Sequence, residues 1–219
     1  MKDLTDFIND LKVDKASGLD NIKNEFIKAA PLLVHAIILH FINLMLRTTI
    51  APKDWCLDLI VPIHKEGDKD NPDNYRGLCI MNTLLKLVCT IRSKRLQKFL
   101  TAEKIIRPEQ ISFKPKSRTS DHILTIKALV NKYVCDQKNS KLYTCFVDFK
   151  KAFDSVPQHL LYKQLNKKNI NGKFLSLLKN IYKKTECAVK FGNFRTNFFK
   201  YAKGLRQGDP LSPLLFNMY

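Results

Sequence analysis

The pattern of apolar and polar residues predicts three helices in the first part of the chain. Apolar residues recur at helical spacing over residues 4–13, which predicts a helix there. A short second helix should run to residue 30, capped by Asp20 or Asn21 and stopped by Pro31. Residues 32–48 contain the longest apolar run, and we expect them to form a buried helix.

Alternating and periodic stretches predict the elements that follow. Residues 55–63 alternate like a strand, with Leu57, Leu59 and Val61 on one face. Amphipathic helices are expected over residues 83–100, 121–136, 158–168 and 172–184, the first with Lys86, Arg92, Lys94, Arg95 and Lys98 on its polar side. A hairpin is expected around Gly192 and Asn193. Strands flanked by helices indicate an α+β fold.

One short apolar run carries candidate chemistry. Residues 143–147 (YTCFV) are rich in β-branched and aromatic side chains, which predicts a buried strand ending on Asp148. A carboxylate there could hold Mg²⁺, which prefers oxygen ligands. The alternative is that Asp148 only ends the strand. Asp154, six residues later, is interpreted as a structural residue and possible helix cap.

Length and charge narrow the class of protein. The chain has 219 residues and is 45% hydrophobic, which suits a globular domain with a sizeable core. Its net charge of +18 is concentrated, because residues 86–118 hold ten Lys/Arg against two acids and residues 163–206 hold twelve against one. Two such blocks favour a polyanionic partner, most commonly the phosphate backbone of a nucleic acid, over a membrane surface.

The cysteines and the apolar runs bear on the compartment. The six cysteines form no CxxC pair and no zinc-ligand spacing, so free thiols in a reducing compartment are expected. The first residues lack the apolar core of a signal peptide, and the apolar run at residues 32–46 is too short to span a bilayer. We therefore expect an intracellular protein, in the nucleus or the cytoplasm.

A second motif, GLRQGDPLSP at residues 204–213, combines glycine, proline and polar residues ahead of an apolar stretch. Gly208 would let the backbone approach a ligand closely because it has no Cβ. Gln207 could hydrogen-bond a nucleotide or a template sugar. Taken alone, the segment reads as a loop that leads into a helix at Ser212 and Pro213.

Together, FVDFKKAFDSV (146–156) and GLRQGDPLSPLLFN (204–217) resemble the first two palm motifs of reverse transcriptases. The amino-acid sequences of these motifs are most similar to those of the polymerases of non-LTR (LINE-class) retrotransposons. The similarity continues in four further segments in the family's order: KASGLDNIKNEF (15–26), IVPIHKEGD (60–68) with NYRGL and NTLLK, QISFK (110–114), and RTSDHI (118–123). The resemblance implies a right-hand polymerase with helix-rich fingers and a partial palm.

The resemblance also implies domains and residue roles. Residues 1–50 would form a helical segment ahead of the fingers, 51–140 the fingers and 141–219 part of the palm. The implied reaction is RNA-directed DNA synthesis from dNTPs on an RNA template and DNA primer, with two Mg²⁺ ions about 4 Å apart. The resemblance implies that Asp148, which is also catalytic, and the carbonyl of Phe149 bind the metal ions. Lys65 and Arg76 would contact the triphosphate, and Phe153 would be the steric gate. Gln207 and Gly208 would line the template–nucleotide pocket. For the two cations, solvated surface charge is the alternative.

Some positions depart from the family pattern. Leu19, Asp20 and Asn21 replace the usual Pro-Asp-Gly, and Ser112, Lys116, Ser117 and Arg118 stand where the fingers motif usually has its glycines and neighbours. If those glycines need positive φ, the replacements strain the loop. The Tyr/Phe-x-Asp-Asp motif that supplies further carboxylates does not occur in the 219 residues. We therefore expect this chain, as given, to lack polymerase activity.

Two other interpretations stay open. The chain could be a non-catalytic nucleic-acid-binding protein, derived from such an element, that kept the basic surface and lost the chemistry. It could also be a relative from mobile introns or retrons, although the wording of the motifs favours the LINE class. Whatever the interpretation, a polymerase origin requires Asp148 to lie within a nucleotide's reach of the Gln207–Gly208 loop.

Overall fold

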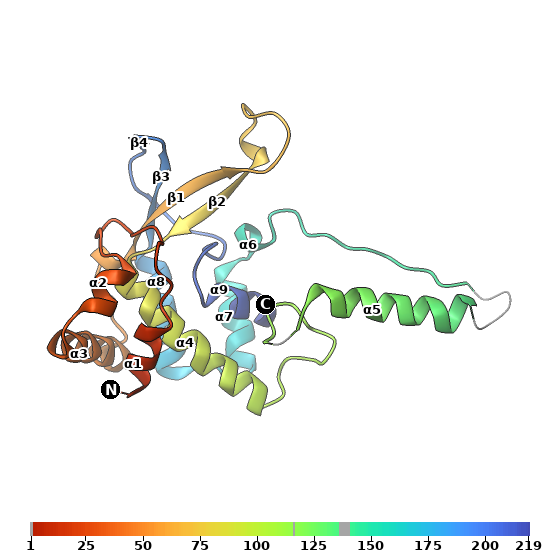
Figure 1. Cartoon of the computed structure of the whole chain (residues 1–219), viewed down its shortest axis with the longest axis horizontal. Coiled ribbons are helices and arrows are strands. Elements are labelled where there is room, and N and C mark those ends of the chain that lie inside the picture. Colours follow the sequence, from red (N-terminus) through yellow and green to blue (C-terminus); the bar gives the residue numbers. More distant parts are fainter. Residues whose placement is uncertain (1, 116, 136–140) are drawn as a thin grey trace.

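The computed structural model describes residues 2–115, 117–135 and 141–219. A sheet lies above a group of helices, and one helix projects sideways from this body (Figure 1). In chain order the helices and strands are α1 (Lys2–Asn9), α2 (Asn24–Ala29), α3 (Leu32–Thr48), β1 (Leu57–His64), β2 (Tyr75–Ile80), α4 (Thr83–Ala102), α5 (Thr119–Val130), α6 (Ala152–Ser155), α7 (Gln158–Lys167), α8 (Gly172–Lys184), β3 (Glu186–Phe191), β4 (Phe194–Arg195), β5 (Phe199–Lys200) and α9 (Ser212–Met218). The mixture confirms the α+β class and is consistent with partial fingers and palm.

The sheet has the strand order β2-β1-β3-β4, and β5 pairs with the first half of β3. β1 runs antiparallel to β2 and parallel to β3. Because side chains alternate along a strand, Asp58 and Leu59 point to opposite faces of this sheet. One face therefore carries a buried carboxylate, and the other carries the apolar stripe of Leu59 and Val61 that the sequence predicts.

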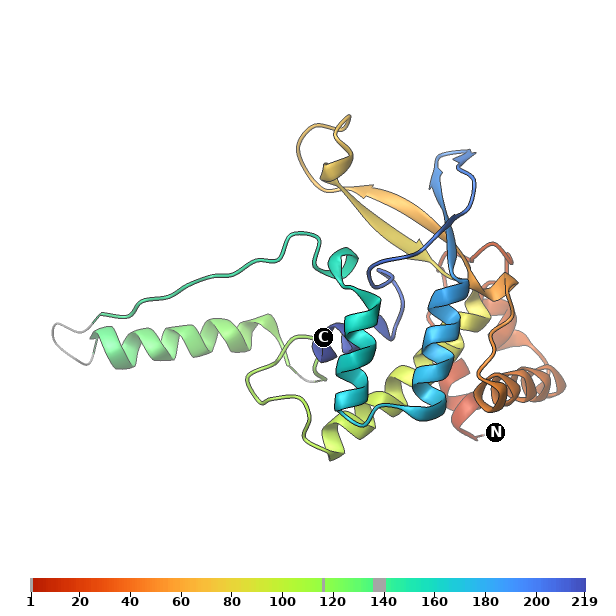
Figure 2. The ribbon, with the colours of Figure 1, turned by 180° about the vertical axis from the view of Figure 1, so that it is seen from behind.

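The core lies between α4, α7, α8 and α9, which are seen together below the sheet in Figure 2. Helices α7 and α8 begin and end within a residue of their predicted bounds, and α4 extends the prediction by two residues at its end. The prediction that Arg92 faces solvent on α4 is wrong. Arg92 is buried, with its guanidinium 4.1 Å from the ring centre of Phe174 and hydrogen-bonded to the carbonyl of that residue.

Two predictions for the N-terminal segment are also wrong. Helix α3 is not buried all round: His35, Ile42 and Met45 are buried, whereas Leu33 is 73% exposed, because only one stripe packs on α1 and α8. Helix α2 begins after Lys23, so neither Asp20 nor Asn21 caps it. The Asp20 carboxylate instead accepts hydrogen bonds from the backbone amides of Ile22 and Thr83 and ties this loop to α4.

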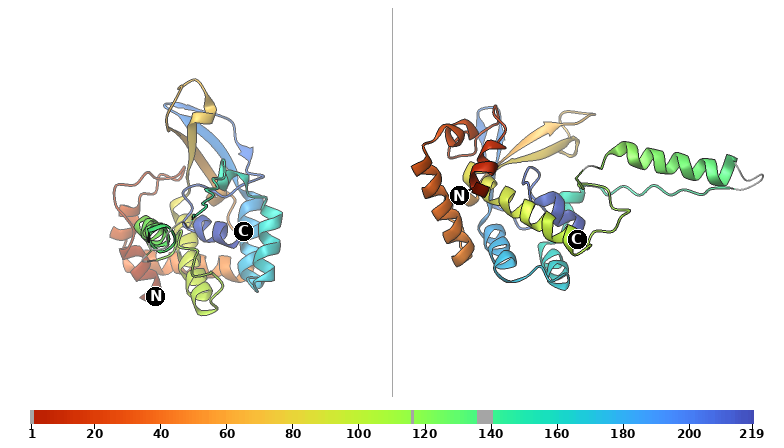
Figure 3. Two further views of the ribbon diagram at one scale, coloured as in Figure 1. Left: turned by 90° about the vertical axis from the view of Figure 1, so that its right-hand side faces the viewer. Right: turned by 60° about the horizontal axis from the view of Figure 1, so that its bottom comes forward.

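The predicted buried strand over residues 142–148 is absent. These residues have no regular structure and run beside α5 in an arm that leaves the body (Figure 3). Phe146 is 82% exposed and Val147 is 73% exposed. A strand needs neighbouring backbone to satisfy its amide and carbonyl groups. No strand in the described residues lies beside this segment, which explains why its sequence preference is not realised.

Candidate functional site

A cleft of about 720 Å³ lies where the β1–β2 hairpin, the turn around α6 and the loop before α9 meet. All seven site residues singled out in the sequence line this cleft: Lys65, Arg76, Asp148, Phe149, Phe153, Gln207 and Gly208. They come from segments more than 140 residues apart in the chain. The requirement that Asp148 lie near the Gln207–Gly208 loop is therefore met, whereas the individual roles stay predictions.

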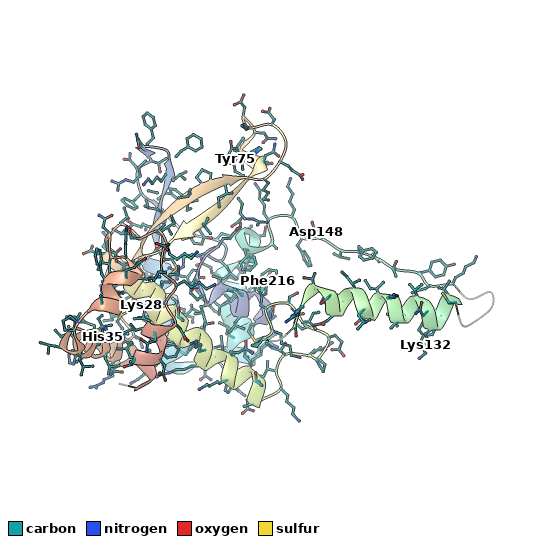
Figure 4. All side chains as sticks on the ribbon, viewed as in Figure 1. Lys28, His35, Tyr75, Lys132, Asp148 and Phe216 are labelled. Carbon is teal, nitrogen blue, oxygen red and sulfur yellow. The ribbon has the colours of Figure 1, made fainter. Side chains whose placement is uncertain are left out.

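Asp148 lies on the extended segment ahead of α6, at the edge of the cleft (Figure 4). It is exposed, as is Phe149. Among the described residues, no group of three or more His, Cys, Asp or Glu side chains is placed to hold a metal ion. One exposed carboxylate and one carbonyl do not make a two-metal site. The described residues alone therefore do not complete the metal pair that the family resemblance implies, and we derive no metal-dependent step from them.

The ring of Phe153 is fixed between two other aromatic residues. It stacks on Phe216 of α9, with ring centres 4.9 Å apart and planes at 12°, and meets Phe113 edge-on at 6.0 Å. Offset stacking and edge-to-face contacts are the arrangements that aromatic quadrupoles favour. A half-buried ring held on two sides is a rigid wall of the cleft, which is the property that a steric gate requires.

Two glycines let the loop of residues 204–213 pack tightly. Gly208 has φ +117°, and a Cβ there would lie 2.5 Å from the carbonyl oxygen of Cys79 on β2. The amide of Cys79 donates to the carbonyl of Gln207 at 2.6 Å. Gly204, with φ +90°, lies against the backbone of Asp154. The loop is thus joined to β2 on one side and to α6 on the other, and only glycine fits at both contacts.

Gln207 has a partner that the sequence did not indicate. Its side-chain nitrogen donates to both carboxylate oxygens of Asp154, at 3.1 Å each. Asp154 is inside α6, so its predicted role as a helix cap is wrong, and its structural role is to hold Gln207. The spacing of the two motifs by about fifty residues gave no signal for this contact, which depends on Gly204 meeting the turn.

A buried ion network lies beneath the cleft. The guanidinium of Arg206 contacts the carboxylates of Asp209 at 2.5 Å and Asp58 at 3.2 Å, and it lies over the ring of Tyr182 at 5.2 Å. Arg206, Asp58 and Asp209 are all at most 2% exposed. Arg206 and Asp58 are 148 residues apart, so the sequence did not indicate that they pair. The single aspartate in the apolar run Leu57-Asp58-Leu59 was nevertheless a usable sign of a buried charged partner.

The charges in this network respond to burial in opposite ways. Burial lowers the pKa of Arg206. The negative charges of Asp209 and Asp58 together raise it by more than burial lowers it, so the net pKa lies above its usual range. Burial raises the pKa of the Asp58 carboxyl by more than Arg206 lowers it. Asp209 is the closer partner of Arg206. One carboxylate oxygen of Asp58 has no hydrogen-bond partner, so burial is less fully compensated at Asp58 and its pKa stays raised.

One exposed ion pair joins two of the segments that line the cleft. Lys151, at the start of α6, donates to the carboxylate of Asp73 in the β1–β2 loop at 2.7 Å. Lys151 has a left-handed backbone, with φ +50°. The contact lowers the pKa of Asp73 through the hydrogen bond and charge of Lys151. Neither residue was predicted, because the pair depends on how the two loops lie against each other.

The departures from the family pattern have mixed outcomes. Asn21, which replaces the last glycine of Pro-Asp-Gly, has φ +54°. Asparagine is among the few residues that tolerate this region, so the predicted strain is modest there. In the fingers segment positive φ falls on Phe113 rather than on Ser112. Lys116 lies outside the described residues.

The seven residues of the reverse-transcriptase-like motifs line one cleft, and comparison with known proteins agrees with the resemblance. A family model described as "Reverse transcriptase (RNA-dependent DNA polymerase)" matches residues 63–219, which is more than half of the chain. The chain therefore belongs to the reverse transcriptase family.

Curated relatives support the same family. The chain is 26% identical over its whole length to the "Probable RNA-directed DNA polymerase from transposon BS" of Drosophila melanogaster. It is 28% identical over 81% of its length to a "Retrovirus-related Pol polyprotein from type-1 retrotransposable element R2" of Popillia japonica, and 26% identical over its whole length to the "RNA-directed DNA polymerase from mobile element jockey" of Drosophila funebris. By their names these relatives are RNA-directed DNA polymerases or a Pol polyprotein of transposable elements, in agreement with the motifs. The chain spans only 24% of the length of each.

Two other sequence predictions can be compared with the structure. All six cysteines are free thiols, four buried and two exposed, which agrees with the absence of a disulfide framework. In the part of the chain that the structure describes, no helix is both long and apolar enough to cross a membrane.

Proposed function

We propose that this chain forms the fingers and part of the palm of an RNA-directed DNA polymerase of a non-LTR retrotransposon. The whole protein would add dNTPs to a DNA primer on an RNA template, and it would act inside the cell. The observation that carries the proposal is the convergence of seven motif residues on one cleft. These residues come from three separate segments of the chain.

In this proposal the chain's own residues bind and orient the nucleotide. Lys65 and Arg76 supply cations to the triphosphate, since phosphoryl transfer depends mostly on positioning and charge neutralisation. Phe153, fixed by Phe216, excludes a ribose 2′-hydroxyl. Gln207 and Gly208 form the wall that contacts the template–nucleotide pair, and Asp154 holds the Gln207 amide in place.

The metal is proposed to be Mg²⁺, which when bound would neutralise charge on the reacting phosphates. Asp148 and the carbonyl of Phe149 would contribute ligands. Because the described residues contain no metal-ligand cluster, further carboxylates from a longer protein would be needed. We therefore expect the 219-residue chain to be inactive by itself.

Two assays test the proposal. Primer extension with the 219-residue chain, Mg²⁺, dNTPs and an RNA template should give no templated product. Fluorescence anisotropy with a labelled dNTP should detect weak binding that Arg76→Ala reduces. Lys98→Ala, a change on α4 away from the cleft, is the matched control and should bind like the wild type. Equal binding by all three chains would contradict the proposed nucleotide site.

A second candidate function is a non-catalytic nucleic-acid-binding protein derived from such an element. The exposed position of Asp148 and the concentrated positive charge favour it. The two functions differ in their response to metal. If Asp148→Ala changes Mg²⁺-dependent nucleotide binding, the chain has kept the metal-dependent nucleotide binding of a polymerase. If the substitution has no effect while RNA binding persists, the non-catalytic function is favoured.

A further inference from the structure

Arg92 is a buried cation without a counter-charge. It is 2% exposed, and among the described residues no carboxylate lies within ion-pair distance of its guanidinium. One face of the guanidinium lies over the ring of Phe174, and Nη2 donates to the carbonyl of the same residue. Its Nε and Nη1 have no hydrogen-bond partner in the described part of the chain. A buried unpaired charge with free donors is costly, which indicates that a ligand or water meets these donors.

Three other buried donors in the same region also lack a partner among the described residues. They are Nε of Arg206, the hydroxyl of Tyr182 and Oγ of Ser212. The guanidinium carbon of Arg206 lies 5.2 Å from the ring centre of Tyr182, and its Nη2 contacts the sulfur of Cys89 at 3.9 Å. Cys89 is on α4, one turn before Arg92, so the two arginines approach the same part of this helix.

Electrostatic effects place Arg92 and these donors in one cluster. Burial lowers the pKa of Arg92, and the charges of Asp209 and Arg206 also act on it. Burial raises the pKa of the Tyr182 hydroxyl, whereas the charge of Arg206 lowers it. The side chain of Ser212 is close enough to lower that pKa as well, although the two hydroxyls do not form a hydrogen bond of normal geometry. The donors therefore lie near one another as well as being buried.

The unpartnered groups of this cluster are mostly donors. The nitrogens of an arginine can only donate, and the hydroxyls of Tyr182 and Ser212 can donate as well as accept. Both oxygens of Asp209 are occupied, one by Arg206 and the other by a backbone amide. The exception is Oδ1 of Asp58, an acceptor without a partner. Donors gathered around an uncompensated positive charge suit a negative ligand that only accepts hydrogen bonds, whereas a water molecule has two hydrogens of its own to donate.

We propose that a small monovalent anion of the chemical class of chloride binds between Arg92, Tyr182 and Ser212. It neutralises the Arg92 guanidinium and accepts hydrogen bonds from both hydroxyls, and Nε of Arg206 is a further donor. The ion enters from the floor of the 720 Å³ cleft, which Arg206, Asp209 and Ser212 line. Oxyanions as large as sulfate do not fit, because the donors are at most 2% exposed.

The position of the ion gives it a structural effect. Arg92 is on α4, Tyr182 on α8 and Ser212 on α9, so the ion joins three helices of the core beneath the cleft. A ligand that binds only the folded chain stabilises it. The proposal does not rest on the proposed function, since it uses none of the seven residues assigned to metal or nucleotide binding.

The first test is urea unfolding of the 219-residue chain, followed by circular dichroism, while chloride replaces gluconate at constant ionic strength. A bound ligand multiplies the folding equilibrium constant by 1 + [L]/Kd, so chloride at about nine times its dissociation constant should raise that constant about tenfold. Bromide should act like chloride, and sulfate should not replace either. Equal stability in chloride and gluconate would mean that water meets the donors, and it would overturn the proposal.

Two variants test the hydroxyl donors. Ser212→Ala and Tyr182→Phe each remove one hydroxyl, and each should weaken the apparent affinity for chloride about tenfold or more, because hydrogen bonds to a charged group are strong. Both variants should fold in gluconate, where the lost hydroxyls have no partner. The matched controls are Ser176→Ala, exposed on α8, and Tyr162→Phe, half-buried on α7, which should respond to chloride like the wild type. The same chloride dependence in all four variants would contradict the proposed site.

Two further measurements test the charge and the position. Arg92→Met removes the unpaired cation, so the dependence of stability on chloride should disappear. Anomalous X-ray diffraction from crystals grown in sodium bromide should show a peak between Arg92, Tyr182 and Ser212. Wild-type chloride dependence in Arg92→Met, or bromide bound only elsewhere, would overturn the proposal. Labelled dNTP binding by Ser212→Ala and Tyr182→Phe reports separately on the nucleotide, so a failure of this proposal is distinguishable from a failure of the proposed function.

Discussion

The side chain of Gln207 faces Asp154 with its nitrogen, which donates to both carboxylate oxygens at 3.1 Å. An ionised carboxylate can only accept hydrogen bonds, so the amide cannot be turned the other way. The side-chain carbonyl oxygen of Gln207 (Oε1), unlike its backbone carbonyl, therefore remains available to a ligand in the cleft. A ligand group that donates a hydrogen bond, such as a sugar hydroxyl, fits that position.

Asp154→Ala should release Gln207 and weaken binding of a labelled dNTP or template–primer by about fivefold, the equivalent of about 1 kcal/mol for a lost hydrogen bond. Asp154→Asn should lose less, because its amide oxygen can still accept. Anisotropy titrations measure both. Asp6→Ala on α1 is a control for the lost negative charge, and if it matches Asp154→Ala, the contact has no specific role.

Arg206→Met should strongly destabilise the fold because it leaves the carboxylates of Asp58 and Asp209 buried without their partner. Breaking a buried ion pair by removing one member costs about 3–5 kcal/mol. Urea unfolding followed by circular dichroism measures the change. Lys94→Met, which breaks the exposed pair with Asp10, should have a much smaller effect. Equal losses in the two variants would contradict the importance of burial.

The raised pKa of Asp58 predicts a specific pH dependence. Burial raises its folded-state pKa above the ordinary value of 3.8, so the folded state holds this proton to higher pH than the unfolded state does. The stabilisation is complete below pH 3.8 and is lost as pH rises through the folded pKa. Wild-type stability should therefore fall relative to Asp58→Asn as pH increases through that window. Parallel stability curves for the two chains would show that Asp58 does not titrate abnormally.

Gly208→Ala should distort the loop, because the new Cβ would meet the carbonyl oxygen of Cys79 at 2.5 Å and φ would stay at +117°. We expect a loss of about 2–4 kcal/mol in unfolding free energy, with weaker nucleotide binding. Gly172→Ala also has positive φ, +57°, but has nothing within 4 Å. It isolates the backbone strain of about 1 kcal/mol, so a similar loss in both would rule out the close contact.

Residues 142–149 should exchange their amide hydrogens rapidly, because no strand in the described residues pairs with them. The amides of β1, which pairs with β2 over residues 59–64 and with β3 over residues 57–60, should be protected for much longer. Hydrogen–deuterium exchange with peptide-level mass spectrometry compares the two segments in one experiment. Protection of residues 142–149 equal to that of β1 would mean that a partner strand is present in solution.

Local patterns in the sequence were sufficient for several elements and for the members of the candidate site. Helices α7 and α8 follow directly from apolar spacing between clear breaks, because neighbouring residues along a helix determine its buried face. The family motifs identified Lys65, Arg76, Phe153 and the Gln207–Gly208 loop, which the structure brings into one cleft. Motifs succeed here because ligand binding constrains residue type at fixed short spacings.

Only the tertiary structure decided the long-range relationships. Asp58 meets Arg206, Asp154 meets Gln207, and Arg92 is buried, and each of these depends on which elements pack together rather than on local preference. Residues 142–148 have the composition of a strand, but they remain extended and exposed because strand formation requires partner backbone that local sequence cannot supply. The sequence by itself indicated the family and seven residues of the cleft, whereas the fold determined which further residues join them and which contacts hold Phe153 and Gln207 in place.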